Sequence, residues 1–398
     1  MKKLICFVFP ITTLLGQINY TGSIKPGNMY RLSDQSEISL PFRLGEQEVG
    51  YSLGDFEIKT NSALEYRWSN NENEFQLREA YLMWYPSWGE VKVGKQIHAW
   101  GAVDGNNPTD NLNPYDYYYM FLPGAERKVG TVSGSLKYYW NDWQFEGVFI
   151  PEHEGNRFPF GETAFPLDFP MSAPKLMDEE PGSEFGFRLQ STLGSSDFSI
   201  SYFDGRDRSF SKVGITDSIP SFFYRNTSVL GFDLVSFIGD FTNRFEIGYF
   251  STENDAESNM KTLNDASYIQ FTGQVEYSTE NDIMFSLQII GSQISEINGT
   301  MTKDEFQPGM GTPFASFTDL GLSFSLSANY LDDALELMGN TFIDLKDSQS
   351  MVGASVRYSP MDNWKLNMSV SKFMGDEGTQ FHEMEDFSHL KVGLEYHF

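Results

Sequence analysis

The sequence predicts an all-β protein whose strands close into a transmembrane, antiparallel, up-and-down β-barrel of about 18 strands. Three observations carry this prediction. Many segments alternate apolar and polar residues with a period of two, and the connections between them alternate between short turns and longer loops. The composition is 16% aromatic with 35 Gly, yet no window after residue 16 is apolar over the about 18 residues that a spanning helix needs.

The final strand shows the alternation most clearly, because residues 390–398 place an apolar side chain at every even position. One face is predicted to meet lipid and the other a wet lumen, and a closed barrel satisfies all backbone groups in a bilayer. The lipid-facing residues are Leu390, Val392, Leu394, Tyr396 and Phe398, and the lumen-facing ones are Lys391, Glu395 and His397. The same pattern recurs in residues 56–68, 143–149, 185–193, 241–249, 269–277, 283–289, 320–330, 335–345, 352–358 and 364–370.

The strand count depends on one ambiguous stretch. Residues 31–52 can be interpreted as one strand, as two, or as an inward-folded segment, so 16 strands is the alternative to 18. Closure of the barrel requires the last strand to pair with a strand within residues 17–32. The pair Arg78-Glu79 breaks the apolar phase of its strand, which predicts a β-bulge there.

The ends of the chain predict where the protein resides. Residues 1–16 have a basic start and an apolar run, as in a secretory signal peptide, which leaves residues 17–398 as a single barrel domain. Cys6, the only cysteine, lies in this expected signal. The alternating strand that ends on Phe398 resembles the C-terminal recognition strand of bacterial outer-membrane barrels. That resemblance implies an outer-membrane location, with membrane lipid and the barrel-assembly machinery as partners.

The net charge is −27, from 55 acidic and 28 basic residues. Such an acidic chain is not expected to bind nucleic acid, because phosphate recognition needs a basic surface. The outer loops 151–183, 252–265 and 375–387 carry more carboxylates than bases. Either these loops are simply exposed to water on the outer surface, or they form an acidic vestibule that gives weak cation selectivity.

The most unusual stretch runs from Gly94 to Tyr119. Period two places Gln96, His98 and Trp100 on the lumenal face, and the following loop carries Asp104, Asp110 and Asp116. The loop 101–128 either caps the barrel from outside or folds into the lumen and narrows it. A Ca²⁺ site at Asp104, Asn106 and Asp110 is a weaker alternative, because the spacing differs from an EF-hand.

This G-K-Q, W-G, D-G and N-P-Y-D run resembles large outer-membrane porins of the alginate-export type. The resemblance implies a passive diffusion channel for small hydrophilic solutes. The remaining pore-lining candidates come from the polar strand faces, where both signs of charge occur and no ladder of bases is present. These candidates are Arg67, Arg188, Arg244, Glu246 and Arg357.

An enzyme is not expected, since none of the five histidines stands in a nucleophile–base or metal-binding motif and no phosphate-binding loop is found. The sequence therefore predicts no catalytic residue, no cofactor and no metal site. The function expected is an outer-membrane porin. The alternative is a plugged barrel that acts as a structural or surface-interaction protein through its acidic loops.

Overall fold

The fold is known from a computed structural model of the chain. It describes residues 16–122, 124–167, 169–174, 176, 182–216, 219–253, 265–299, 302–303, 306–316 and 318–398. The expected signal peptide, apart from Gly16, and the acidic run Asp178-Glu179-Glu180 lie outside these described residues. In the described part of the chain, no helix has the length and hydropathy to cross a bilayer.

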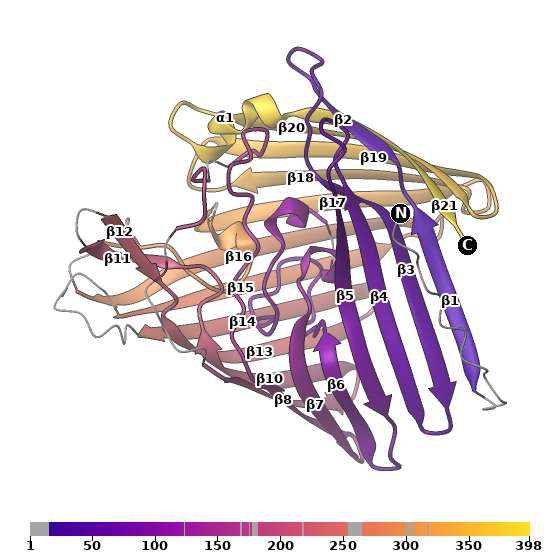
Figure 1. The fold of residues 1–398 in the computed structure, drawn as a ribbon, viewed down its shortest axis with the longest axis vertical. Coiled ribbons are helices and arrows are strands. Elements are labelled where there is room, and N and C mark those ends of the chain that lie inside the picture. The colour runs from indigo at the N-terminus through magenta and orange to yellow at the C-terminus, as the bar shows by residue number, and fades with distance from the viewer. Residues whose placement is uncertain are drawn as a thin grey trace, which may run out of the picture.

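Nineteen strand segments hydrogen-bond into one antiparallel sheet (Figure 1). They are β1 (Gln17–Ile24), β2 (Gly27–Arg31), β3 (Phe42–Leu53), β4 (Phe56–Tyr66), β5 (Asn73–Trp84), β6 (Gly89–Gln96), β7 (Thr131–Trp140), β8 (Trp143–Ile150), β9 (Glu184–Leu193), β10 (Ser196–Arg206), β13 (Asn226–Ile238), β14 (Phe241–Glu253), β15 (Asp265–Ser278), β16 (Ile283–Asn298), β17 (Leu320–Tyr330), β18 (Leu335–Asp344), β19 (Gln349–Met361), β20 (Trp364–Gly375) and β21 (His389–His397). A separate hairpin, β11 (Ser211–Thr216) and β12 (Ile219–Phe223), lies in the loop after β10. Short helical turns are η1 (Tyr117–Tyr119), η2 (Gly124–Arg127), η3 (Pro313–Ser316), α1 (Gln380–Glu383) and η4 (Glu385–Phe387).

The sheet closes where the two ends of the chain meet. β1 and β2 are two segments of one strand, interrupted at Lys25-Pro26, and both pair with β21 while β1 also pairs with β3. Counting them together turns the nineteen segments into 18 strands and confirms the closed barrel. The ambiguous region resolves into one strand, β3, preceded by a connection over residues 32–41.

The cross-strand register places apolar residues of neighbouring strands in common rows. Leu394 lies opposite Leu366, and Tyr396 lies opposite Trp364, where the two rings pack at a tilt at the short-turn end with centroids 4.8 Å apart. On the other face, Asn367 Nδ2 donates to Glu395 Oε1 over 2.7 Å. The period-two assignment of lipid and lumen faces is therefore kept along the closing strand.

The bulge predicted at Arg78-Glu79 is present. Asn61 of β4 pairs with Glu79, and the next residue, Ser62, pairs with Leu77, so Arg78 is the extra residue of β5. The side chains of Arg78 and Glu79 consequently both reach polar groups inside the barrel. This bulge makes Arg78 available to the interior without shifting the apolar face of the rest of the strand.

Figure 1 shows the connection between β6 and β7 running inside the barrel rather than over its rim. This segment, residues 97–130, is called the inner loop below. The loops after β8, β10, β16 and β20 pack around it. Residues of the inner loop and of the loops after β2, β8, β16 and β20 form two buried apolar clusters with inward-facing strand residues in the mouth of the barrel.

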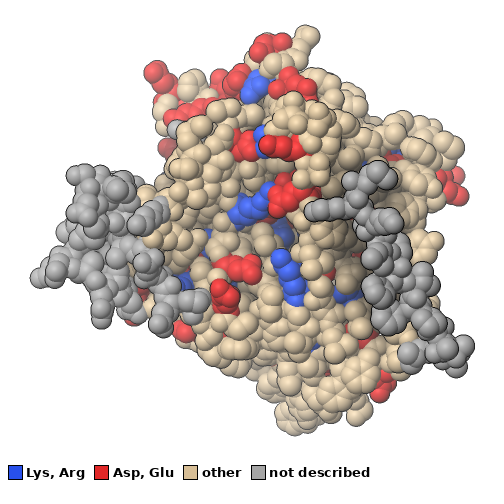
Figure 2. Space-filling view, in the orientation of Figure 1, with Lys and Arg blue, Asp and Glu red and all other residues tan. Residues whose placement is uncertain are grey.

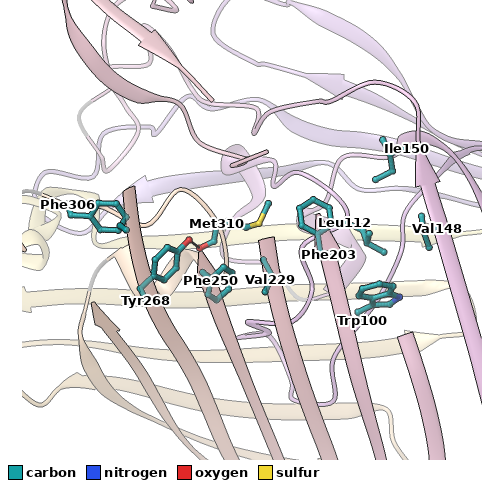
Figure 3. Close-up of a cluster of buried hydrophobic side chains, with 11 residues drawn as sticks. Trp100, Leu112, Val148, Ile150, Phe203, Val229, Phe250, Tyr268, Phe306 and Met310 are labelled. Atoms are coloured by element: carbon teal, nitrogen blue, oxygen red, sulfur yellow. Dashed lines mark hydrogen bonds between the residues drawn. The ribbon is translucent and has the colours of Figure 1, made fainter. Parts of the chain in front are cut away.

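The first cluster combines the inner loop with the inward faces of several strands (Figure 3). Trp100 and Leu112 of the inner loop and Phe306 and Met310 of the loop after β16 are all buried. The strand residues are Val148, Ile150, Phe203, Val229, Phe250, Ala266 and Tyr268, and the rings of Phe250 and Tyr268 stack with centroids 4.6 Å apart. The lumen is thus apolar at this level, because the loops pack against the wall there.

Candidate functional site

The candidate site is the inner loop together with the barrel wall that holds it. Asn113 ties the two ends of the loop together, since its Nδ2 donates to the carbonyls of Gln96, at 3.0 Å, and Val129, at 2.9 Å. Its Oδ1 accepts from the backbone N–H of His98 over 2.6 Å. One buried amide therefore closes the neck of the loop and directs the intervening chain into the lumen.

The predicted lumenal residues at the start of the loop are buried against the wall. Gln96 Nε2 donates to the Ser133 carbonyl over 3.0 Å, and the His98 Nε2 lies 3.0 Å from the Ser133 hydroxyl. Burial lowers the pKa of His98 from 6.5 to about 3, so its ring is neutral. Trp100 Nε1 donates to Glu146 over 3.2 Å, which places this indole inside the barrel and not in an interfacial belt.

The tip of the loop is held by β14. Glu246, which has no exposed surface, accepts hydrogen bonds from the backbone N–H of Val103 at 2.7 Å and from Asn107 Nδ2 at 2.9 Å. The Ala102 N–H also donates to this first oxygen, Oε1, while the other oxygen, Oε2, accepts from the hydroxyl of Thr109 over 2.9 Å. We call this arrangement the Glu246 anchor. All its donors are neutral, so aligned dipoles and no cation stabilise the carboxylate.

Close approach of the chain to Glu246 depends on a glycine. Gly101 has φ of +98°, a conformation that L-residues rarely adopt. A Cβ at this position would lie only 2.5 Å from Glu246 Oε1 and 2.8 Å from Asn107 Nδ2. The W-G dipeptide singled out in the sequence therefore marks the position where the loop turns onto the wall.

Strands β15 and β16 hold the next residues of the tip. Asp104 exchanges two hydrogen bonds with Gln274, at 2.8 and 2.9 Å, and its carbonyl accepts from Gln288 Nε2 over 2.7 Å. Asn106 donates to Gln288 over 3.1 Å. Asp104 and Asn106 are thus engaged by amides of the wall. Among the residues that the structure describes, no group of three or more His, Cys, Asp and Glu side chains is placed to hold a metal ion.

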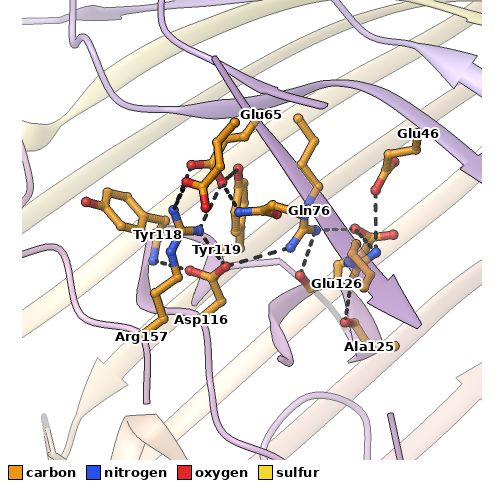
Figure 4. Close-up of polar contacts among 12 residues, drawn as sticks. Glu46, Glu65, Gln76, Asp116, Tyr118, Tyr119, Ala125, Glu126 and Arg157 are labelled. Carbon is orange, nitrogen blue, oxygen red and sulfur yellow. Dashed lines mark hydrogen bonds and ion pairs between the residues drawn. The ribbon is translucent and has the colours of Figure 1, made fainter. Parts of the chain in front are cut away.

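A second contact lies on nearly the opposite wall, formed by β3, β4 and β5 (Figure 4). Arg157, from the loop after β8, contacts Glu65 of β4 at 2.7 Å and Asp116 of the inner loop at 2.9 Å. We call the group that surrounds these contacts the arginine cluster. It comprises Arg43, Arg78 and Arg157 with Glu46, Glu65, Asp116 and Glu126.

The other two arginines of this cluster bind the end of the inner loop. Arg43 contacts Glu126 at 2.7 Å and lies 3.9 Å from the centre of the Tyr119 ring. Arg78 donates to the Ala125 carbonyl over 2.7 Å and lies 3.4 Å from Glu46. Burial raises the pKa of Asp116, while its contact with Arg157 opposes that rise. Every guanidinium in the cluster is therefore matched by a carboxylate.

The remaining predicted pore-lining residues fall into two groups. Arg67 pairs with Glu162, and Arg244 donates to the Ala102 carbonyl over 2.8 Å and pairs with Glu276 at 3.3 Å, so both support inward loops or the tip. Arg188 pairs with Asp233 at 3.1 Å along the wall. Arg357 pairs with Glu336 and, with a side chain 49% exposed, takes no part in the loop contacts.

A small polar cavity of about 20 Å³ lies where the inner loop meets the loops after β8, β10 and β16. Asp110, Asn111 and Tyr115 line it, and in the described part of the chain Asp110 Oδ1, Asn111 Oδ1 and the Tyr115 hydroxyl have no hydrogen-bond partner. Arg208 also lines the cavity, but its guanidinium is engaged by Glu184 at 2.7 Å and by backbone carbonyls. The polar groups left available here are oxygen atoms.

Sequence reasoning did not find the wall residues that hold the loop. Gln274, Gln288 and Arg43 were not singled out, because any polar residue on an inward strand face fits a wet lumen equally well. One signal was present: residues near the outer ends of β8, β10, β14 and β15 are apolar on both faces. A lumenal face that turns apolar at one level indicates that protein, and not water, fills the barrel there.

A closed 18-strand antiparallel barrel with a loop folded into its lumen has the architecture of outer-membrane porins. Similar solved structures support this fold. OccK11 (OpdR) of Pseudomonas aeruginosa has a TM-score of 0.55 at 12% identity, with 96% of each chain covered. A BenF-like porin of Pseudomonas fluorescens Pf-5 has a TM-score of 0.57 at 12% identity, covering 97% of this chain and 98% of its own.

A third similar structure is OccK2 (OpdF) of Pseudomonas aeruginosa in complex with glucuronate, with a TM-score of 0.56 at 10% identity and coverage of 96% and 97%. No family model matches the chain, and no curated protein matches its sequence. The expected resemblance to alginate-export-type porins is not supported, since the similar structures are Opd/OccK and BenF-like porins. At these identities the likeness establishes the fold.

Proposed function

We propose that this protein is an outer-membrane channel for the passive diffusion of small hydrophilic solutes, with a weak preference for cations and neutral molecules over anions. The observation that carries the proposal is the inner loop, which both walls hold inside an 18-strand barrel. A barrel of this size encloses an aqueous channel that an inward loop narrows. The proposal includes bacterial outer-membrane localisation.

The selectivity follows from which charges remain available. Figure 2 shows a hollowed face where basic and acidic residues lie side by side along the hollow. The arginines of the arginine cluster, together with Arg67 and Arg208, are paired with carboxylates. The positive charge of these arginines is thus neutralised locally, whereas three oxygens of the polar cavity have no hydrogen-bond partner among the described residues. Such an interior favours solutes that donate hydrogen bonds.

Reversal potentials across a KCl gradient in planar bilayers test the selectivity. Weak cation preference is expected, and it should fade at high salt as the Debye length falls from about 10 Å at 0.1 M to about 3 Å at 1 M. The double variant E377Q/E383Q, in the exposed loop before β21, should reduce the preference, and E280Q at a short turn is the matched control. Anion preference, or equal reversal potentials for all three proteins, contradicts an acidic vestibule.

Liposome swelling tests the solute class. Neutral sugars of graded size should enter at rates that fall with size, and glucuronate, the ligand present in the OccK2 structure, should enter more slowly than glucose. Faster entry of glucuronate contradicts the proposed preference.

A plugged barrel with a structural or surface-interaction role is the second candidate. The observation that favours it is the burial of residues from the inner loop and from the loops after β2, β8, β16 and β20 in two apolar clusters inside the mouth. Channel recordings separate the two functions, because a plugged barrel conducts little and a porin shows discrete conductance steps. An absence of conductance from correctly folded protein supports the plugged barrel and contradicts the porin.

A further inference from the structure

The lipid-facing surface has a depression where two glycines interrupt the apolar rows of β6 to β9. The depression is open to one side, has a volume of about 350 Å³ and is lined almost wholly by apolar atoms. The register gives the two rows that form it. One row is Val93, Gly134, Phe149 and Phe185, and the adjacent row is Val91, Leu136, Gly147 and Phe187.

The two glycines matter because they lack a side chain, and not because the backbone needs a conformation that only glycine adopts. A Cβ at Gly134 would meet no atom within 4 Å, and a Cβ at Gly147 would meet the Phe187 ring at an ordinary 3.8 Å. Neither residue has the positive φ that would require glycine. Because Gly134 and Gly147 lie in adjacent rows on neighbouring strands, their missing side chains form one diagonal trough between exposed phenylalanine rings.

The height of the trough in the membrane follows from strand geometry. Trp140 and Trp143 flank the short turn between β7 and β8, which marks one interface. At about 3.3 Å per residue and a tilt of about 40°, Gly134 lies about 15 Å above this level, within an apolar band of about 25 Å. The trough therefore extends from the middle of the bilayer into the outer leaflet.

A basic residue lies at the upper end of the trough. Lys95 is opposite Val132 in the next row toward the outer surface, two residues beyond Val93 on the same face of β6. Its long side chain reaches the headgroup level from there. Glu154, at the base of the following loop, is a nearby carboxylate that the charge of Lys95 influences.

We propose that this trough binds one acyl chain of a phosphorylated, multiply acylated glycolipid of the outer leaflet, of the lipid A type, whose phosphate meets Lys95. The inference rests on the proposed outer-membrane localisation. A linear chain fits a trough that runs down the barrel wall. A second copy of the protein fits poorly, because two convex barrels diverge on either side of their contact line.

Native mass spectrometry of the purified full chain in mild detergent, titrated with diphosphorylated lipid A, tests the proposal. Wild type should retain one lipid A, and G134L/G147L should bind it at least about tenfold more weakly, since two leucines occupy the place of several buried methylene groups. The matched control is G339L, another lipid-facing position where a Cβ meets nothing closer than 4.0 Å. It should bind as wild type does.

The headgroup contact is tested separately. K95Q should weaken lipid A binding about fivefold, as expected for one basic residue at an anionic surface. K372Q removes another lysine that lies in a lipid-facing row, opposite Val352 of β19, and should have no effect. Single-channel conductance should be unchanged in all four variants, which separates failure of this inference from failure of the proposed channel.

Three results would overturn the proposal. One is equal lipid A binding by wild type and G134L/G147L. Another is equally tight binding of phosphatidylethanolamine to wild type. The third is a change of oligomeric mass in G134L/G147L, which would show that the trough is an interface between copies of the protein.

Discussion

The inner loop is held at two places by opposite physical means. At the Glu246 anchor a fully buried carboxylate accepts hydrogen bonds from neutral donors of the loop. At the arginine cluster, carboxylates and guanidinium groups from five segments neutralise one another. The first arrangement has little dependence on ionic strength and demands precise backbone geometry. The second tolerates looser geometry, as its distances of 2.7 to 4.0 Å indicate, and responds to salt.

This difference indicates how a barrel can carry a loop across its lumen. Oriented N–H groups suit a place where the backbone itself touches the wall, as at Gly101. Ion pairs suit a place where long side chains meet from separate segments, as Arg157, Glu65 and Asp116 do. Four predictions test the comparison, ordered by the size of the expected effect.

The largest effect is expected for E246A. Removing the carboxylate takes the acceptor from the N–H groups of Ala102 and Val103, from the Thr109 hydroxyl and from one N–H of the Asn107 amide, and each orphaned group costs about 1–3 kcal/mol. We expect docking of the tip to weaken by about 4 kcal/mol, measured as loss of hydrogen-exchange protection at residues 101–109. Barrel strands should keep their protection, and so should the tip in the control E336A, whose partly exposed carboxylate pairs with Arg357 away from the inner loop. If hydrogen exchange at the tip is unchanged in E246A, Glu246 does not anchor the loop.

R157A should have a smaller effect, because the Arg157 side chain is 30% exposed. The variant leaves Glu65 and Asp116 buried without their shared cation, which should weaken the arginine cluster by about 2–3 kcal/mol. Adding E65Q should restore part of this loss, since it removes one uncompensated charge. A double-mutant cycle on loop exchange measures the recovery, and its absence contradicts the proposed charge matching.

Acid should loosen the neck of the loop at His98. The folded pKa of about 3 lies below the unfolded 6.5, so the stabilisation is complete above pH 6.5 and is lost as the pH falls from 6.5 toward 3. At pH 5 the loss should be about 2 kcal/mol. Exchange at residues 97–100, compared between wild type and H98Q from pH 8 to 5, measures it. Identical pH profiles would show that His98 is not the sensitive group.

The smallest effect should come from salt. Raising NaCl from 0.1 to 1 M should weaken the arginine cluster by about 0.5 kcal/mol, because its partly exposed pairs are screened. The Glu246 anchor should not respond. Exchange at residues 116–127 should therefore rise with salt while residues 101–109 stay constant. If hydrogen exchange in both regions responds equally to salt, the two contacts do not differ in the way proposed.

The sequence by itself determined the barrel, because a period-two pattern has only two faces and a bilayer permits no open strand edge. Closure of β21 on the first strand, the bulge at Arg78-Glu79 and the lumenal side of Gln96 and His98 all followed from that constraint. The strand count stayed between 16 and 18, since local pattern alone does not show whether residues 31–52 form one strand, two, or an inward-folded segment; the structure places one strand, β3, there.

Only the tertiary structure decided where the inner loop goes and what holds it. A cap outside and a constriction inside have the same local sequence, and they differ in contacts between residues more than a hundred positions apart, such as Val103 with Glu246 or Asp104 with Gln274. Inward-facing polar residues can hydrogen-bond either to water or to a loop. Which partner they have depends on the packing of the whole lumen, and the local residue pattern does not show it.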